Sequence, residues 1–396
     1  MAERRPRPDI RALRVLHRGR TALHYRDAVL PVRALADGVA ACESALEGLA
    51  RRGAFDPAAF AAFANAQVLT VWLAPLADSA SARALLPGAF VELLEERRRA
   101  QPERVARLVA QAAELRDALA AAGVESLVLK GGGLAVRLYP APERRHQWDV
   151  DLLVREGALG EAFQVLGRLG YRVREHPADG AFVRDRIERI ESGALHRGKH
   201  SLEARREDAR VDVHWRIGGR LADRVDHAAL WASRATCTLR GERFETLCEE
   251  HALCLLLLGI AADLKRGACR GKQLLDLFLA LRTWGPGTDW EAFLARRSRE
   301  GLLRVAVNVL GLMDVTWGGV DAIPALAERL TRFRSRILLP DPADAEALLQ
   351  NPRGAAENRA WYKRLYPRSR IQHVAWQIAD ARLRSRTPRG HASASP

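Results

Sequence analysis

The sequence predicts an α+β fold in which a compact α/β unit lies between two helical regions. Changes in the spacing of apolar residues indicate this arrangement. Apolar residues recur every three or four positions in 105–119, as in an amphipathic helix, but alternate with polar residues in 148–154, as in a strand. Helical spacing returns after Thr246, which forms a predicted capping box with Glu249.

The first 122 residues are predicted to be a helical region. The Asp-Pro pair at 56–57 predicts a helix start, and the apolar residues that follow run on to Leu73. The Gln-Pro pair at 101–102 predicts the start of another helix, for which Gly123 supplies the C-cap.

Residues 123–245 are predicted to form the α/β core. Strand and helix patterns alternate here within a short stretch, which is typical of one compact unit. Strands are expected at 126–129, 148–154, 171–174, 200–204 and 211–217, and helices at 131–139 and 159–169. Residues 246–386 are predicted to be a helical C-terminal region, and 387–396 a disordered tail.

The composition is that of a globular protein, with 48% hydrophobic and 28% charged residues. The formal net charge of +15 comes from arginines spread along the chain, which favours a compositional bias over nucleic-acid binding. No apolar run reaches the roughly 18 residues of a membrane span. The five cysteines include no C-x-x-C pair, which argues against a zinc site and fits a reducing cytoplasm. We therefore expect a cytoplasmic protein with no membrane contact.

The most informative segment is the strand around Asp149 and Asp151. Side chains alternate between the two faces of a strand, so these carboxylates share one face while Val150 and Leu152 point to the other. Two adjacent carboxylates repel each other, and a hard divalent cation such as Mg²⁺ or Mn²⁺ relieves that repulsion. The alternative is a strand end that carries two solvated aspartates.

A glycine-rich turn follows the first predicted strand. Lys130, Gly131 and Gly132 open the helix at 131–139, where backbone N–H groups and the helix N-terminus favour a phosphate. Basic residues just before the aspartate pair are further candidates to meet a polyphosphate: Arg144, Arg145 and His146. The alternatives are a flexible turn and an exposed basic loop.

Asp212 is the candidate for a third carboxylate. It alternates with Val211 and Val213 in a later strand, and His214 shares its face as a ligand, a substrate contact or a satisfied polar residue. The segment 267–272 is one residue short of a P-loop and has Gln273 where serine or threonine should follow the lysine. It is therefore rejected as a P-loop.

Several of these motifs together resemble the family of uncharacterised nucleotidyltransferases, within the DNA polymerase β-like superfamily. The similarity extends roughly from Arg33 to Trp290 and is strongest between Leu129 and Arg216. It rests on Lys-Gly at 130–131, Tyr-Pro at 139–140, Arg145, D-V-D-L-L-V at 149–154, L-G-Y at 169–171, D-V-H-W-R at 212–216 and L-L-D-L at 274–277.

The resemblance implies a polymerase β-type core, a mixed sheet with flanking helices. It also implies that Asp149 and Asp151 form the metal-binding pair and that Asp212 is the third carboxylate. The phosphate-binding turn would be 130–132, with Arg145 as a further nucleotide contact. Candidate accessory residues are His214 and Asp276. The chain departs from the superfamily by having Lys-Gly in place of Gly-Ser, and Trp148 in place of a small residue.

The resulting prediction is an enzyme that moves an NMP from an NTP such as ATP to an acceptor, with Mg²⁺ or Mn²⁺ as cofactor. The acceptor could be a small molecule, a peptide, a protein or an RNA end. Two alternatives belong to other classes. One is a catalytically weak nucleotide-binding scaffold or regulatory module, and the other is a basic nucleic-acid-binding protein.

Overall fold

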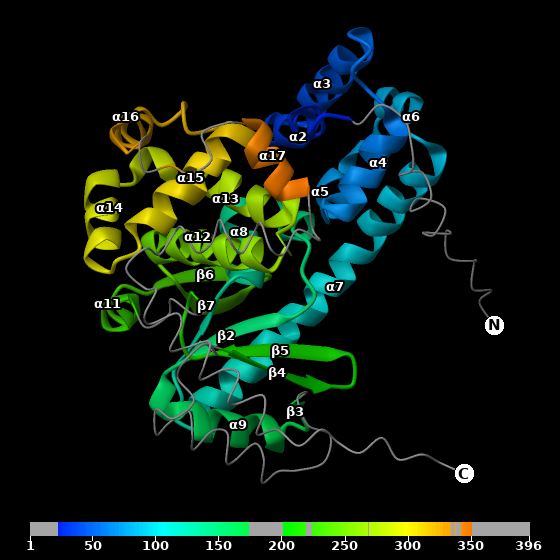
Figure 1. The fold of residues 1–396 in the computed structure, drawn as a ribbon. Helices are drawn as coiled ribbons and strands as arrows, with labels where there is room; N and C mark the ends of the chain where they lie inside the picture. Colours follow the sequence, from blue (N-terminus) through cyan, green and yellow to red (C-terminus); the bar gives the residue numbers. More distant parts are fainter. Residues whose placement is uncertain are drawn as a thin grey trace, which may run out of the picture.

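A computed structural model describes residues 23–173, 201–218, 224–267, 269–333, 337 and 342–350. In these ranges one seven-stranded sheet has the order β3-β4-β5-β2-β1-β7-β6. The strands are β1 (Ser126–Val128), β2 (Val150–Val154), β3 (Arg172–Val173), β4 (Ser201–Arg206), β5 (Ala209–His214), β6 (Ala235–Leu239) and β7 (Glu242–Thr246). The sheet is mixed, because β2 is parallel to β5 but antiparallel to β1. The expected mixed sheet with flanking helices is therefore confirmed (Figure 1).

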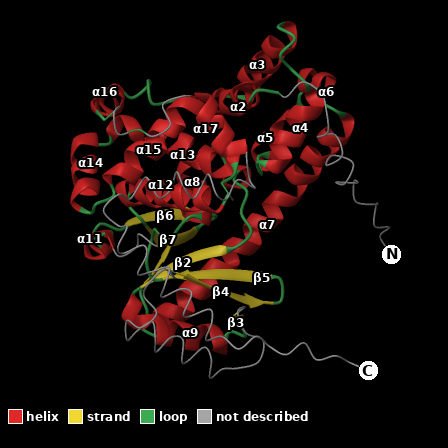
Figure 2. Cartoon of the chain, viewed as in Figure 1, coloured by secondary structure: helices red, strands yellow, loops and turns green. Residues whose placement is uncertain are grey.

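Helices surround this sheet and make up most of the described chain (Figure 2). Before the sheet lie α2 (Tyr25–Ala34), α3 (Val39–Arg51), α4 (Pro57–Ala66), α5 (Thr70–Leu73), α6 (Ala80–Leu85) and α7 (Gly88–Ala121). Between the strands lie α8 (Gly131–Leu138), α9 (Leu159–Arg168) and α11 (His227–Ala232). After them come α12 (Glu249–Arg266), α13 (Gly271–Trp284), α14 (Trp290–Arg299), α15 (Leu303–Thr316), α16 (Pro324–Arg332) and α17 (Pro342–Gln350). The expected tail at 387–396 lies outside the described residues.

Helix α7 corrects one expectation from the sequence. The Gln-Pro pair at 101–102 does not start a helix but lies inside this 34-residue helix. Proline lacks the N–H that an interior position donates and usually breaks or kinks a helix. The turns before Pro102 are nevertheless held in place, because Phe90 and Leu94 are buried in the hydrophobic core. Tertiary packing therefore overrides the local signal.

Two other helix boundaries also differ from the expectations. The helix expected up to Leu73 is interrupted at Val68, which has a φ of 59°. The backbone at Gln67 is instead paired with the start of α13, where Lys272 N–H donates to the Gln67 carbonyl. The predicted capping box is wrong, because Thr246 ends β7 and its hydroxyl donates to the Val128 carbonyl at 2.7 Å.

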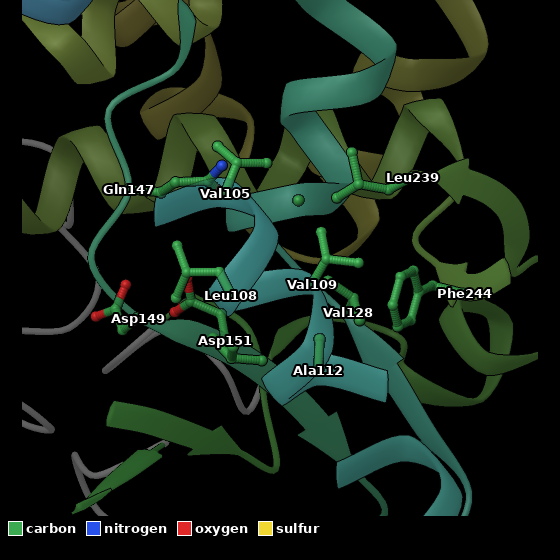
Figure 3. Close-up of a pocket in the computed structure, with 12 residues that line it drawn as sticks. Val105, Leu108, Val109, Ala112, Val128, Gln147, Asp149, Asp151, Leu239 and Phe244 are labelled. Atoms are coloured by element: carbon green, nitrogen blue, oxygen red, sulfur yellow. The ribbon is translucent and has the colours of Figure 1, made fainter. Parts of the chain in front are cut away.

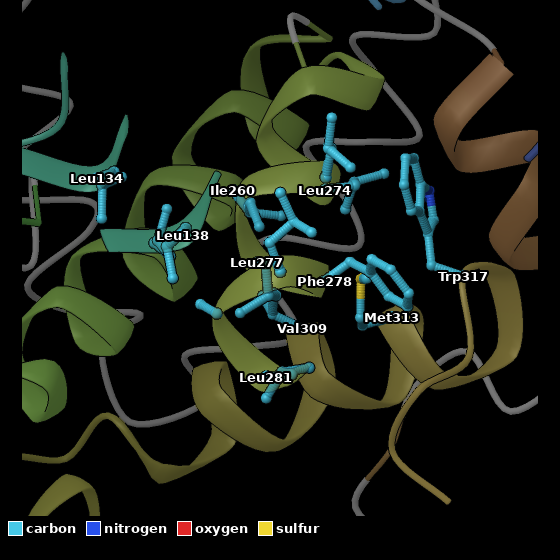
Figure 4. Packing of buried hydrophobic residues seen from close by; sticks show 14 of the residues in the cluster. Leu134, Leu138, Ile260, Leu274, Leu277, Phe278, Leu281, Val309, Met313 and Trp317 are labelled. Carbon is cyan, nitrogen blue, oxygen red and sulfur yellow. The ribbon is translucent and has the colours of Figure 1, made fainter. Parts of the chain in front are cut away.

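The sheet separates two hydrophobic cores. Val128 and Leu152 point toward α7 and α9, whereas Leu127 and Leu153 point into the larger core. Helices from both ends of the chain share that larger core, part of which Figure 4 shows around α13. The domain boundaries at residues 122 and 245 therefore remain a proposal, because one continuous core joins the two helical regions.

Within the part of the chain that the structure describes, no helix has the length and apolar character needed to cross a membrane.

Candidate functional site

The site is built on two neighbouring parallel strands, β2 and β5. Asp151 lies directly beside Asp212, and Leu153 lies beside His214. In-register residues of adjacent strands point to the same face of a sheet. The three polar side chains therefore share one face, although Asp151 and Asp212 are far apart in the sequence. The family resemblance implies that these carboxylates meet, and the pairing of β2 with β5 brings Asp151 and Asp212 together.

Asp151, Asp212 and His214 form a compact cluster. One ligand atom from each of the three lies within 4.8 Å of the other two. Nε2 of His214 is 3.0 Å from Oδ1 of Asp151 and 3.2 Å from Oδ2 of Asp212. Carboxylate oxygens and an imidazole nitrogen are donors that suit a divalent cation. His214, which the sequence leaves as an accessory residue, thus lies at the centre of the cluster.

The cluster places one buried and one partly buried carboxylate around a buried imidazole. Burial alone would lower the pKa of His214, but the charges of Asp212 and Asp151 raise it to about 9. Burial opposes ionisation of Asp151, yet the hydrogen bond from His214 and the charge of Lys130 hold its pKa well below the usual range. The imidazolium therefore supplies the positive charge that these carboxylates require.

Asp149 adjoins this cluster without being one of its three members. It precedes the first residue of β2, Val150, and lies in a bend rather than in the strand. Burial and the charges of Asp151 and Asp212 raise the pKa of Asp149. Three carboxylates therefore converge closely enough to repel one another, as we expect for residues that share a cation.

The turn at Lys130 lies at the same end of the strands. Lys130 is the N-cap residue of α8, and its positive charge lowers the pKa of both Asp149 and Asp151. A Cβ at Gly131 would lie 3.6 Å from the Asp149 carbonyl, so the start of α8 is in van der Waals contact with the bend at Asp149. The predicted phosphate-binding turn and the predicted metal pair are thus neighbours.

Arg145 has a different environment from the one that the sequence suggests. Its Nε and Nη2 donate to the two oxygens of Asp276 at 2.9 and 2.8 Å, and its Nη1 donates to the Gly131 carbonyl. Tyr139 donates its hydroxyl to the same carboxylate at 2.6 Å. Arg145 is only 2% exposed, so its guanidinium fixes the loop before Asp149 to α13 rather than facing a ligand.

Lys272 also lies near the carboxylates, and the motifs of the sequence do not single it out. It lies at the start of α13, with Nζ 3.8 Å from Oδ2 of Asp276. Its positive charge lowers the pKa of Asp149, while burial and the charge of Arg145 lower its own pKa to about 8. Lysine is scarce in this chain, and Lys272 stands four residues before Asp276 on one helix face. This spacing is the feature of the sequence that could have identified Lys272.

A shallow pocket lies on the α7 side of the sheet (Figure 3). Its walls are mainly apolar and include Val105, Val109 and Phe244, with Asp149 and Asp151 at one side. The lining residues include no lysine or arginine to pair with a phosphate, and their members without an apolar side chain, besides the two aspartates, are Gly132 and Gln147.

Comparison with known proteins identifies the family. A family model described as "uncharacterised nucleotidyltransferase" matches residues 53–318. No curated protein and no solved structure matches the chain. The matched stretch covers more than half of the 396 residues and includes the three carboxylates, Lys130 and Lys272. The chain therefore belongs to this nucleotidyltransferase family.

Proposed function

We propose that this protein is a metal-dependent nucleotidyltransferase that moves an NMP from an NTP to an acceptor. The observation that carries the proposal is the meeting of Asp151, Asp212 and His214 on one sheet face, next to Asp149. Lys130, at the start of α8, and Lys272, on α13, supply positive charge close to these carboxylates. Anionic metal ligands beside cationic phosphate ligands are what the binding of a metal–triphosphate complex requires.

The donor set fits Mg²⁺ or Mn²⁺. The carboxylates of Asp149, Asp151 and Asp212 offer hard oxygen ligands, and their mutual repulsion is only partly offset by His214. When bound to these residues, the cation would stabilise charge on the phosphate oxygens and on the attacking oxygen. The family membership supports the same reading.

In the proposed reaction, Lys130 and Lys272 hold the triphosphate, and Asp212 accepts a proton from the nucleophilic group of the acceptor. That group attacks the α-phosphorus while the bond from the α-phosphorus to the bridging oxygen breaks. Pyrophosphate leaves, and the acceptor carries the NMP. Arg145 and Asp276 act as positioning residues, because their ion pair holds the loop that leads into Asp149.

The direct test uses purified protein, α-labelled NTPs, Mg²⁺ and a panel of acceptors from each class: small molecules, peptides, proteins and RNA ends. We expect metal-dependent release of pyrophosphate together with transfer of label. Asp151→Asn should abolish both. Asp208→Asn should change neither activity, because Asp208 is an exposed residue in the turn between β4 and β5. Tight NTP binding with no turnover for any acceptor would instead favour a nucleotide-binding module.

A further inference from the structure

Trp148, which directly precedes Asp149, is 51% exposed. Among the described residues, the other large hydrophobic side chain with comparable exposure is Leu30 at 38%. An indole can bury 150–250 Å² of surface in a core or an interface. Here about half of the side chain stays in contact with solvent, one residue before Asp149.

The indole is nevertheless held in one orientation. The guanidinium carbon of Arg104, on α7, lies 3.8 Å from the ring centroid of Trp148. The ring of His146 packs against it edge-on, with centroids 5.1 Å apart and planes at 68°. A cation over one face of an indole is a favourable contact. Arg104 covers one face, and about half of the Trp148 side chain remains exposed.

The surroundings of the indole are positively charged. Burial and the charges of Lys272 and Arg104 lower the pKa of His146 to about 3, so its imidazole is neutral. The pKa of Arg104 itself is lowered by burial and by its neighbours Arg97 and Arg107. A ligand that is both flat and anionic therefore fits this region best. A nucleotide combines these two properties.

We propose that Trp148 is the stacking platform for the base of the nucleotide whose phosphates bind at Lys130 and Lys272. This inference rests on the proposed function and adds the base subsite to it. An aromatic face recognises the π-surface of a base rather than its hydrogen-bonding edge, so stacking tolerates every base. The platform therefore implies broad NTP usage, in which purines bind more tightly than pyrimidines because they stack over a larger area.

The test compares ATP, UTP and inorganic tripolyphosphate in calorimetric titrations with Mg²⁺. Loss of a stacked base weakens binding by roughly 10- to 100-fold. Trp148→Ala should weaken ATP binding by that factor and UTP binding by less, while tripolyphosphate affinity changes by less than about twofold. Trp148→Phe, which keeps an aromatic face, should restore most of the ATP affinity. Leu30→Ala is the matched control for removal of an exposed hydrophobic side chain and should change nothing.

The outcomes separate this inference from the proposed function. If Trp148→Ala binds ATP like the wild type, or loses tripolyphosphate equally, the base platform is overturned and the proposed function stands. An unchanged ATP affinity with an increased KM for the acceptor would assign the indole to the acceptor and likewise overturn the proposal. A wild-type protein that binds neither ATP nor tripolyphosphate would overturn both.

Discussion

His214 lies between two carboxylates that would otherwise repel each other. Its Nε2 is within hydrogen-bonding distance of both Asp151 and Asp212; His214 and Asp151 are buried, and Asp212 is partly buried. In such surroundings a positive charge is needed to keep both acids ionised. The imidazolium meets this need in the structure as described, and a divalent cation would meet it with more charge. The charge state of each of these three side chains therefore depends on the other two.

Asp212 is the residue whose replacement best separates binding from chemistry. If it accepts the acceptor's proton, Asp212→Asn should lower kcat on the order of 10²- to 10⁴-fold. The dissociation constant for NTP with Mg²⁺ should change far less, because the proton moves only in the transfer step. Calorimetry and initial rates on the same preparation measure the two quantities. Asp208→Asn again serves as control, and an equal loss of affinity and rate would limit Asp212 to metal binding.

Lys272 makes a second prediction about a single residue. A charge-assisted contact contributes about 1.5–3 kcal/mol, so Lys272→Ala should weaken NTP binding by roughly 10- to 100-fold. Lys272→Arg keeps the charge and should retain part of the affinity. Lys265→Ala, on α12, removes a lysine elsewhere in the helical region and is the matched control. An unchanged affinity for tripolyphosphate in Lys272→Ala would show that this lysine only supports Asp276.

At the scale of elements, the close approach of α8 to the sheet sets the position of Lys130. A Cβ at Gly133 would lie 2.7 Å from Oγ1 of Thr246 and 3.1 Å from the Val128 carbonyl. Backbone cannot move aside as a flexible side chain can, so the third glycine of this turn is required by packing. The glycines therefore set how closely the start of α8 packs against the sheet.

Gly133→Ala should consequently destabilise the fold by about 1–3 kcal/mol, the usual cost of overpacking. Gly167→Ala is the matched control, because Gly167 lies within α9 and a Cβ there meets nothing within 4 Å. Alanine at that position should stabilise the protein by about 0.5–1 kcal/mol. Urea unfolding of both variants measures these changes. A neutral Gly133→Ala would mean that α8 shifts easily, and that the turn has no fixed geometry.

The sequence predicts those features that depend on neighbouring residues, but not those that depend on contacts between residues far apart in the chain. The alternation around Asp151 and around Asp212 identifies both strands and the face of each carboxylate, because a period of two is a local property. It cannot identify the pairing of β2 with β5, or the bend that takes Asp149 out of β2. Local rules also fail at Pro102, where burial of the preceding turns keeps α7 continuous.

At the scale of the whole molecule, the site depends on contacts between the sheet and the C-terminal helices. Arg145 and Asp276 are 131 residues apart in the sequence, and no local pattern predicts that they pair. Their ion pair joins the loop before Asp149 to α13, the helix that also carries Lys272. A nucleotide bound between Lys130 and Lys272 would therefore contact both the α/β core and the C-terminal helices. The larger hydrophobic core, which both terminal regions share, supports this arrangement.

The Arg145–Asp276 pair gives the prediction at this scale. Both side chains are almost fully buried, at 2% and 3% exposure, so removing Arg145 leaves the buried Asp276 carboxylate with only Tyr139 and the more distant Lys272 as partners. Such a loss costs about 3–5 kcal/mol, and Arg145→Met should lower the free energy of unfolding by that amount. Asp276→Asn should destabilise the fold as well, because the guanidinium then lacks its counter-ion. Urea unfolding with an unchanged m-value measures both effects.

The control for this prediction is an ion pair of the same kind in a different environment. Arg51 and Glu47 form an exposed pair on α3, with 71% and 45% of their side chains accessible. Exposed pairs contribute from about zero to 1 kcal/mol, so Arg51→Met should leave stability nearly unchanged. If Arg145→Met also left the free energy of unfolding nearly unchanged, the buried pair would not hold α13 against the sheet. Lys272 would then have no fixed position relative to Asp149, and its assignment to the phosphates would lose its structural basis.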